Sequence, residues 1–107
     1  MPYRYLLLIC LAAGQAHAFT NIELSGKPKE FITAESTSKP LLPTLQENIP
    51  EGWSVVLRGE PVAPPAVQVQ GGATWLENLD KVGRDANLHF RIDAREMRVV
   101  VEQANGG

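Results

Sequence analysis

The stretch that decides the fold is TWLENLDKVGRDA, residues 74–86. Thr74 opens it and Glu77 follows three positions later, the pattern of a capping box, in which both side chains satisfy the first free amides of a helix. On the polar side, Glu77 precedes Lys81 and Asp80 precedes Arg84 by four positions, a spacing that favours ion pairs along a helix. The sequence therefore predicts an amphipathic helix. Its apolar face is formed by Trp75, Leu76, Leu79, Val82, Gly83 and Ala86.

Two short strands are expected directly after this helix. Asn87 is a residue that can end a helix in the left-handed conformation. In LHFRI, residues 88–92, apolar and polar side chains alternate, and in MRVVVE the residues Met97, Val99 and Val101 share one face. Only DARE separates the two runs, so the sequence predicts an antiparallel hairpin.

On the N-terminal side of residue 74, a second helix and a strand are expected. The leucine pattern in PLLPTLQENI predicts a short amphipathic helix at about residues 41–48. The next apolar run, WSVVL at 53–57, is rich in β-branched residues and predicts a strand. We expect Trp53, Val55 and Leu57 to face the core, because they alternate along that strand.

A loop and a further strand complete the pattern. GEPVAPPA, residues 59–66, carries three prolines and predicts a loop, whereas AVQVQ at 66–70 predicts a strand that a pair of glycines ends. The resulting order is α-β-β-α-β-β, which predicts a small α+β domain. We expect one open sheet with both helices packed on one side.

The domain is expected to span residues 40–103. Residues 19–39 mix isolated apolar residues with Ser, Thr, Lys, Glu, Gly and Pro without a sustained period, which predicts a flexible N-terminal arm. The last residues, 104–107, are expected to form a disordered tail.

The first 18 residues, MPYRYLLLICLAAGQAHA, have the layout of a secretory signal peptide, with Arg4, a short apolar run and a small-residue cleavage site. We expect cleavage after Ala18 and a periplasmic or extracellular protein. A lipoprotein signal acylated on Cys10 is the alternative, although the bulky Ile9 before it is unfavourable. The rest of the chain has no second long apolar run, so no direct membrane span is expected.

The charge of the chain disfavours one class of partner. The formal net charge is −2, and no basic patch that could neutralise phosphates is visible, so nucleic-acid binding is not expected. Gly71 and Gly72 precede a helix, but they lack the spacing and the lysine of a phosphate-binding loop.

Few side chains could support catalysis. After removal of residues 1–18, His89 is the single histidine and no cysteine remains. A solvent-facing strand residue is the better interpretation of His89 than a catalytic base. Ser54 lacks the sharp turn that exposes a nucleophilic serine, and Glu77 and Asp80 have helical partners. We expect no catalytic residue, no metal, no cofactor and no enzymatic activity.

A surface for recognition remains. An open sheet has two edges with unpaired backbone groups, which can accept a strand from another chain. The outer face of the predicted sheet would present a mixed apolar and basic patch, with a simple solvated face as the alternative. The candidate partner-binding residues are Val56, Arg58, His89, Arg91, Arg98 and Val100.

The run from PLLPTLQENIPEGWSVVLRG to VQVQGGATWLENLDKVGRDANLHFRIDAREMRVVVE carries a family resemblance. Its features are a leucine-rich helix ending in P-x-G-W, then G-G-x-x-W-L-x-x-L, and a closing hairpin with D-x-x-x-x-R-V-V-V. Over about residues 40–103 it resembles the C-terminal domain of the toxin co-regulated pilus biosynthesis protein Q family. It is also similar to the small N-terminal domains of secretins and of TonB-dependent receptors, whose fold has two helices against small sheets.

The resemblance implies a non-enzymatic periplasmic accessory that binds an outer-membrane secretin, or a neighbouring envelope protein, in type IVb pilus biogenesis or a related conjugation or secretion system. It also implies that the protein could form an oligomer within a ring complex. Members of the family are often longer or carry a lipid anchor. A structural subunit of a type IV secretion core complex and a periplasmic hydrolase inhibitor are the alternatives.

Overall fold

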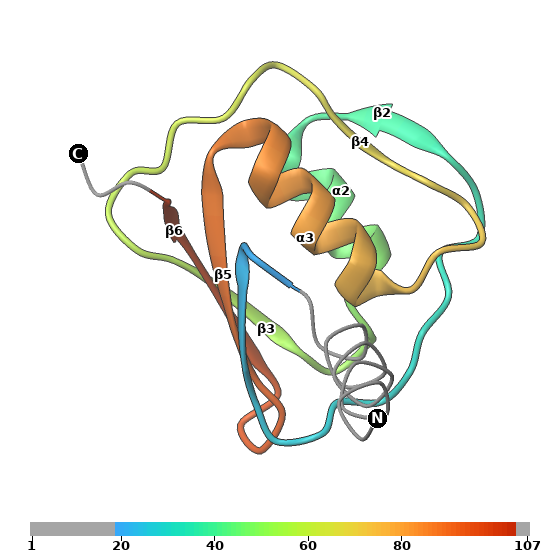
Figure 1. Ribbon diagram of the computed structural model, residues 1–107, viewed down its shortest axis with the longest axis vertical. Coiled ribbons are helices and arrows are strands. Elements are labelled where there is room, and N and C mark those ends of the chain that lie inside the picture. Colours follow the sequence, from blue (N-terminus) through green and yellow to red (C-terminus); the bar gives the residue numbers. More distant parts are fainter. Residues whose placement is uncertain (1–18, 105–107) are drawn as a thin grey trace, which may run out of the picture.

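The computed structural model describes residues 19–104, in which two helices pack against two small sheets (Figure 1). From α2 onward the order is α-β-β-α-β-β, so the predicted α+β class and element order are confirmed. The predicted signal peptide, 1–18, and the last three residues of the predicted tail lie outside the described residues. In chain order the elements are β1 (Ile22–Ser25), β2 (Thr37–Lys39), α2 (Leu41–Asn48), β3 (Ser54–Leu57), β4 (Val67–Val69), α3 (Trp75–Ala86), β5 (Leu88–Asp93) and β6 (Arg98–Gln103).

Helix α3 begins and ends as its sequence predicts. Thr74 Oγ1 accepts the Glu77 amide at 3.2 Å, and Glu77 Oε1 accepts the Thr74 amide at 2.9 Å, so the capping box is complete. Asn87 ends the helix with φ of 60°, the left-handed conformation that short polar side chains tolerate.

The ion pairs on the polar face of α3 differ in part from the prediction. Arg84 Nη1 lies 3.7 Å from Asp80 Oδ2, as expected from the spacing. The predicted pair of Glu77 and Lys81 is wrong, because the Glu77 carboxylate serves the cap and Lys81 Nζ lies 2.8 Å from Asp85 Oδ2.

The strands form two sheets rather than one. The larger has the order β1-β5-β6-β3, with β5 and β6 antiparallel as predicted and with β1 and β3 parallel to their neighbours. The smaller pairs β4 with β2. The prediction of a single sheet is wrong because the proline-rich loop carries the chain away from β3, and β4 finds its partner in a segment of no clear pattern.

Helix α3 connects the two sheets. It packs on β1 and β5 of the larger sheet and on β4 of the smaller one, whereas α2 packs on β2 and β4. The predicted packing of both helices on one side of one sheet is therefore corrected. The core side chains come from all these elements: Ile22, Leu45, Ile49, Val67, Val69, Trp75, Leu79, Val82, Ala86, Leu88, Phe90, Ile92, Val99 and Val101.

Strand β3 is less buried than predicted. Trp53 and Val55 are half-buried against the core, but Leu57 is 43% exposed, because β3 is an edge strand. Trp53 instead meets Trp75 edge to face, with ring centroids 5.1 Å apart. Met97, also expected in the core, is 46% exposed and has φ of 53°, so it belongs to the turn before β6.

The segment predicted as a flexible arm is part of the fold. It contributes β1 and β2, and Asp80 of α3 accepts the amides of Thr20 at 3.0 Å and Asn21 at 2.7 Å. Trp75 is covered by the same segment, because its Nε1 donates to the Lys29 carbonyl at 3.0 Å. At the other end, Ala104 donates its amide to the Asn87 carbonyl at 3.0 Å.

Gly83 lets α3 approach β1 closely, which gives a testable prediction. A Cβ at this position would lie 2.6 Å from Asn21 Cβ and 2.6 Å from the Leu88 carbonyl oxygen. We expect Gly83→Ala to lower the free energy of unfolding by about 1–3 kcal/mol, because the backbone must shift. Urea unfolding followed by tryptophan fluorescence measures this. Arg84→Ala on the exposed side is the control, and equal stability of the two variants would show that α3 is not held this tightly.

Candidate functional site

The six predicted partner-binding residues lie on or beside the outer face of the larger sheet. Along β5 and β6, the positions on this face alternate with the buried core positions. Arg91 lies opposite Val100 in the β5–β6 register, and Val56 lies opposite Val100 in the β3–β6 register. His89 and Arg98 belong to the same alternation, because their neighbours along each strand are buried. Arg58 follows β3 and pairs with Glu102 of this face at 3.8 Å. Whether this outer face binds a partner stays a prediction.

Acidic side chains that the prediction missed also lie on the outer face. Arg91 Nε lies 3.6 Å from Glu23 Oε1 and 3.3 Å from Glu102 Oε2, and His89 Nε2 lies 3.6 Å from Glu23 Oε1. Glu23 comes from β1, within the segment that was expected to be an arm. The outer face therefore carries acidic as well as basic and apolar side chains, whereas the expected patch was apolar and basic.

The charged residues enclose a shallow hollow of about 250 Å³ on the outer face. Arg58, Arg91 and Arg98 line it together with Val100. The side chains of Arg58 and Arg98 are 62% and 43% exposed, and their carboxylate neighbours Glu102 and Glu96 lie at 3.8 Å and 3.2 Å. Exposed pairs of this kind are weak, so both guanidinium groups remain available to an incoming carboxylate.

Strand β3 forms one edge of the larger sheet within residues 19–104. The Ser54 amide donates to the Met97 carbonyl at 2.9 Å, and the Arg58 amide donates to the Val101 carbonyl at 2.8 Å. In a parallel ladder alternate residues face the same neighbour, so Val55 and Leu57 direct their backbone groups away from β6. This edge borders the outer face directly.

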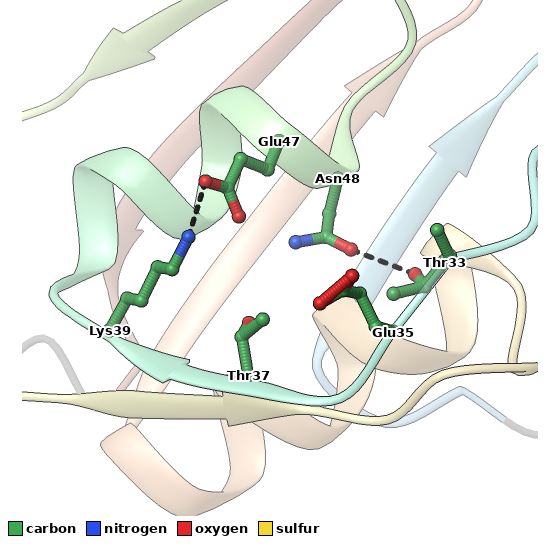
Figure 2. A pocket seen from close by; sticks show the side chains of 7 residues that line it. Thr33, Glu35, Thr37, Lys39, Glu47 and Asn48 are labelled. Atoms are coloured by element: carbon green, nitrogen blue, oxygen red, sulfur yellow. Dashed lines mark hydrogen bonds and ion pairs between the residues drawn. The ribbon is translucent and has the colours of Figure 1, made fainter.

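A second hollow, of about 290 Å³, lies between β2 and α2 and is polar (Figure 2). Lys39 Nζ and Glu47 Oε2 lie 2.6 Å apart across its opening, and the Thr33 hydroxyl donates to Asn48 Oδ1 at 2.8 Å below them. Lys39 pairs with Glu47, and Thr33 bonds to Asn48. The hollow therefore contains hydrogen-bond donors and acceptors, but none of these four residues forms a pair of nucleophile and base. Its lining residues are Thr33, Ala34, Glu35, Thr37, Lys39, Glu47 and Asn48.

Thr33 belongs to a chain of buried hydrogen bonds. Asn48 Nδ2 donates to the Thr44 carbonyl at 2.8 Å, and Asn78 Nδ2 donates to Thr33 Oγ1 at 2.7 Å. Asn78 also accepts the Gln70 amide at 2.9 Å and donates to the Gln70 carbonyl at 3.1 Å. This chain of buried hydrogen bonds therefore joins α2, α3, the end of β4 and the segment before β2.

Sequence reasoning missed this chain, although a signal was present. Asn48 lies four positions after Thr44 in α2, and Asn78 lies between Trp75 and Leu79 on the inner stripe of α3. A polar amide among buried apolar positions indicates a buried partner.

The residues weighed for catalysis have structural roles or stand apart. His89 has Glu23 as its charged neighbour, Ser54 is exposed on the edge strand, and Asp80 holds backbone amides. The amides of Gly71 and Gly72 are used by Ser36 Oγ and the Thr33 carbonyl, both at 2.9 Å, so this turn does not present them to an anion.

Two general findings apply to residues 19–104 only. No group of three or more His, Cys, Asp or Glu side chains is placed to hold a metal ion in this part of the chain. Neither helix found here has the length and apolar character that crossing a lipid bilayer requires.

Comparisons with protein-family models, curated proteins and solved structures found no match for this chain. The family resemblance described from the sequence therefore stays an expectation.

The buried chain gives a prediction with an internal control. Thr33→Val keeps the shape but removes the hydroxyl that Asn48 and Asn78 use, so we expect the free energy of unfolding to fall by about 1–3 kcal/mol. Thr37 Oγ1 is buried and has no hydrogen-bond partner within residues 19–104. Thr37→Val should therefore leave stability unchanged or raise it.

Urea unfolding of both valine variants measures the difference. If the free energy of unfolding fell by a similar amount in the two variants, the effect would come from removing any hydroxyl and not from breaking the buried hydrogen bonds of Thr33.

Proposed function

We propose that this protein is a non-enzymatic interaction module of the bacterial cell envelope. It binds an outer-membrane secretin or a neighbouring envelope subunit in type IVb pilus biogenesis or a related conjugation or secretion system. The envelope location rests on the signal-peptide pattern of residues 1–18. The choice of system rests on the family resemblance of residues 40–103.

The observation that carries the proposal is the continuity of the outer face with the free edge of β3. The six predicted residues lie on or beside one sheet surface, and Val56 on that surface is 42% exposed. A surface that mixes charges with exposed apolar side chains, next to unpaired backbone groups, suits recognition of another protein. Two helices against small sheets are also the arrangement that the resemblance implies.

The side chains of the outer face are separate from the core packing. Alternate residues of β5 and β6 are buried on the inner side of the sheet, where α3 packs on β5, so the outer side chains can change without altering the packing beneath them. Arg91 is the exception, because it bridges Glu23 and Glu102 and holds charges of three strands together. Arg58 and Arg98 are the better residues for a test.

The test is an affinity purification of the full chain, expressed in its host with a C-terminal tag, followed by mass spectrometry of the solubilised envelope. We expect a secretin or another pilus or secretion envelope protein to be retained. Its recovery should fall severalfold for the double variant Arg58→Gln and Arg98→Gln, because the exposed guanidinium groups orient the partner.

The matched control is the double variant Lys81→Gln and Arg84→Gln, which removes the same charge from α3 on the other side of the larger sheet. Its recovery of the partner should equal that of the unchanged protein. Retention of soluble periplasmic hydrolases alone would contradict the proposal and favour an inhibitor. Recovery of a conjugation channel without a secretin would favour a secretion-core subunit.

A further inference from the structure

The free edge of β3 lacks the features that usually protect an exposed strand. Its four residues, SVVL, include no charge and no proline, and Val56 and Leu57 are 42% and 43% exposed. Natural edge strands are commonly protected by lysine, proline or a covering segment, because unpaired backbone groups invite another chain. Within residues 19–104, β3 has β6 as its single ladder partner.

An arginine lies near each end of this edge, and Arg98 Nη2 has Glu96 Oε1 as its carboxylate neighbour at 3.2 Å. Ser54 lies opposite Arg98 in the β3–β6 register, so only a hydroxymethyl group separates the Arg98 side chain from the free edge. Arg58 follows the other end of β3 and points to the same outer face, where Glu102 is its distant neighbour at 3.8 Å. Between the two arginines lies the exposed apolar Val56.

Pairing of residues 54–58, which span β3 and Arg58, with the same residues of a second copy is disfavoured by these charges. The antiparallel pair that joins these residues and keeps both outer faces together centres on Val56, since side chains alternate with a period of two. Ser54 of one copy would then face Arg58 of the other. In that arrangement, Arg58 of the second copy and Arg98 of the first copy lie on either side of Ser54 of the first copy. Their like charges repel each other.

We propose that β3 accepts an extended acidic segment of the partner as a fifth strand of the larger sheet. The segment places acidic side chains opposite Ser54 and Arg58, where Arg98 and Arg58 meet them, and a β-branched side chain opposite Val56. Its two intervening residues are apolar and cover Val55 and Leu57 on the inner side. This inference rests on the proposed function and names the chemistry of the partner.

The required pattern is acid, apolar, β-branched, apolar, acid. It reads the same in both directions, so it fits parallel and antiparallel addition alike. The backbone amides of Val55 and Leu57, which face away from β6, would donate to the new strand, whereas those of Ser54 and Arg58 already serve β6.

A capped synthetic peptide of sequence EVTVE, added at millimolar concentration to the full chain labelled with ¹⁵N, tests the proposal directly. We expect hydrogen exchange of the Val55 and Leu57 amides to slow at least severalfold, because only strand addition gives them acceptors. Exchange of the Ser54 and Arg58 amides should change little.

A charge exchange provides the matched control. The double variant Arg58→Glu and Arg98→Glu should lose about tenfold in affinity for EVTVE and gain affinity for the peptide KVTVK. The unchanged protein should show the opposite preference. A variant that merely unfolds would bind neither peptide, so the gain for KVTVK separates charge recognition from loss of structure.

Absence of protection at Val55 and Leu57, or equal binding of both peptides by the unchanged protein, would overturn the proposal. Dimerisation of the chain through β3 would overturn it too. If a secretin is still recovered from envelopes while EVTVE fails to protect the edge, the proposed function holds and only the docking mode is wrong.

Discussion

The fold depends on one constraint, which is that the buried amides of Asn48 and Asn78 must be hydrogen-bonded. Each side chain lies on the inner side of a helix, and an unpaired amide there would cost a large part of the stability of so small a domain. The Thr33 hydroxyl satisfies both, accepting from one and donating to the other. These two hydrogen bonds hold the segment before β2 between the two helices, and backbone bonds of Phe31 and Thr33 to Trp75, Gly72 and Ala73 hold it as well.

The fold was predictable where the information is local. The capping box defines the start of α3 and Asn87 defines its end, and the short turn after β5 requires a hairpin. The segment 19–39 was not predictable in the same way, because β1 has four residues and β2 has three. Strands this short carry no readable period, and their partners lie far along the chain. Asn78 did signal a buried partner, but the sequence does not say that Thr33 is that partner.

For the candidate surface too, local sequence predicts some features, whereas others depend on pairing between distant strands. Alternation along β3, β5 and β6 is enough to place Val56, His89 and Val100 on one side of the sheet. It does not reveal that β3 and β6 are neighbours, since they are parallel and separated by β4, α3 and β5. Glu23 could not be foreseen at this face, because only the pairing of β1 with β5 brings it there. The edge position of β3 likewise follows from the topology and not from its own residues.

The parallel pairing of β1 with β5 has a consequence for the order in which the chain folds. Residue 22 meets residue 90, so β1 has no partner in the larger sheet until the chain has been synthesised as far as β5. Contacts between such distant residues form slowly, because a long loop must close before they give any gain. The β5–β6 hairpin and α3 are the local elements that can assemble first. We therefore expect the pairing of β1 with β5 to form after the hairpin and α3.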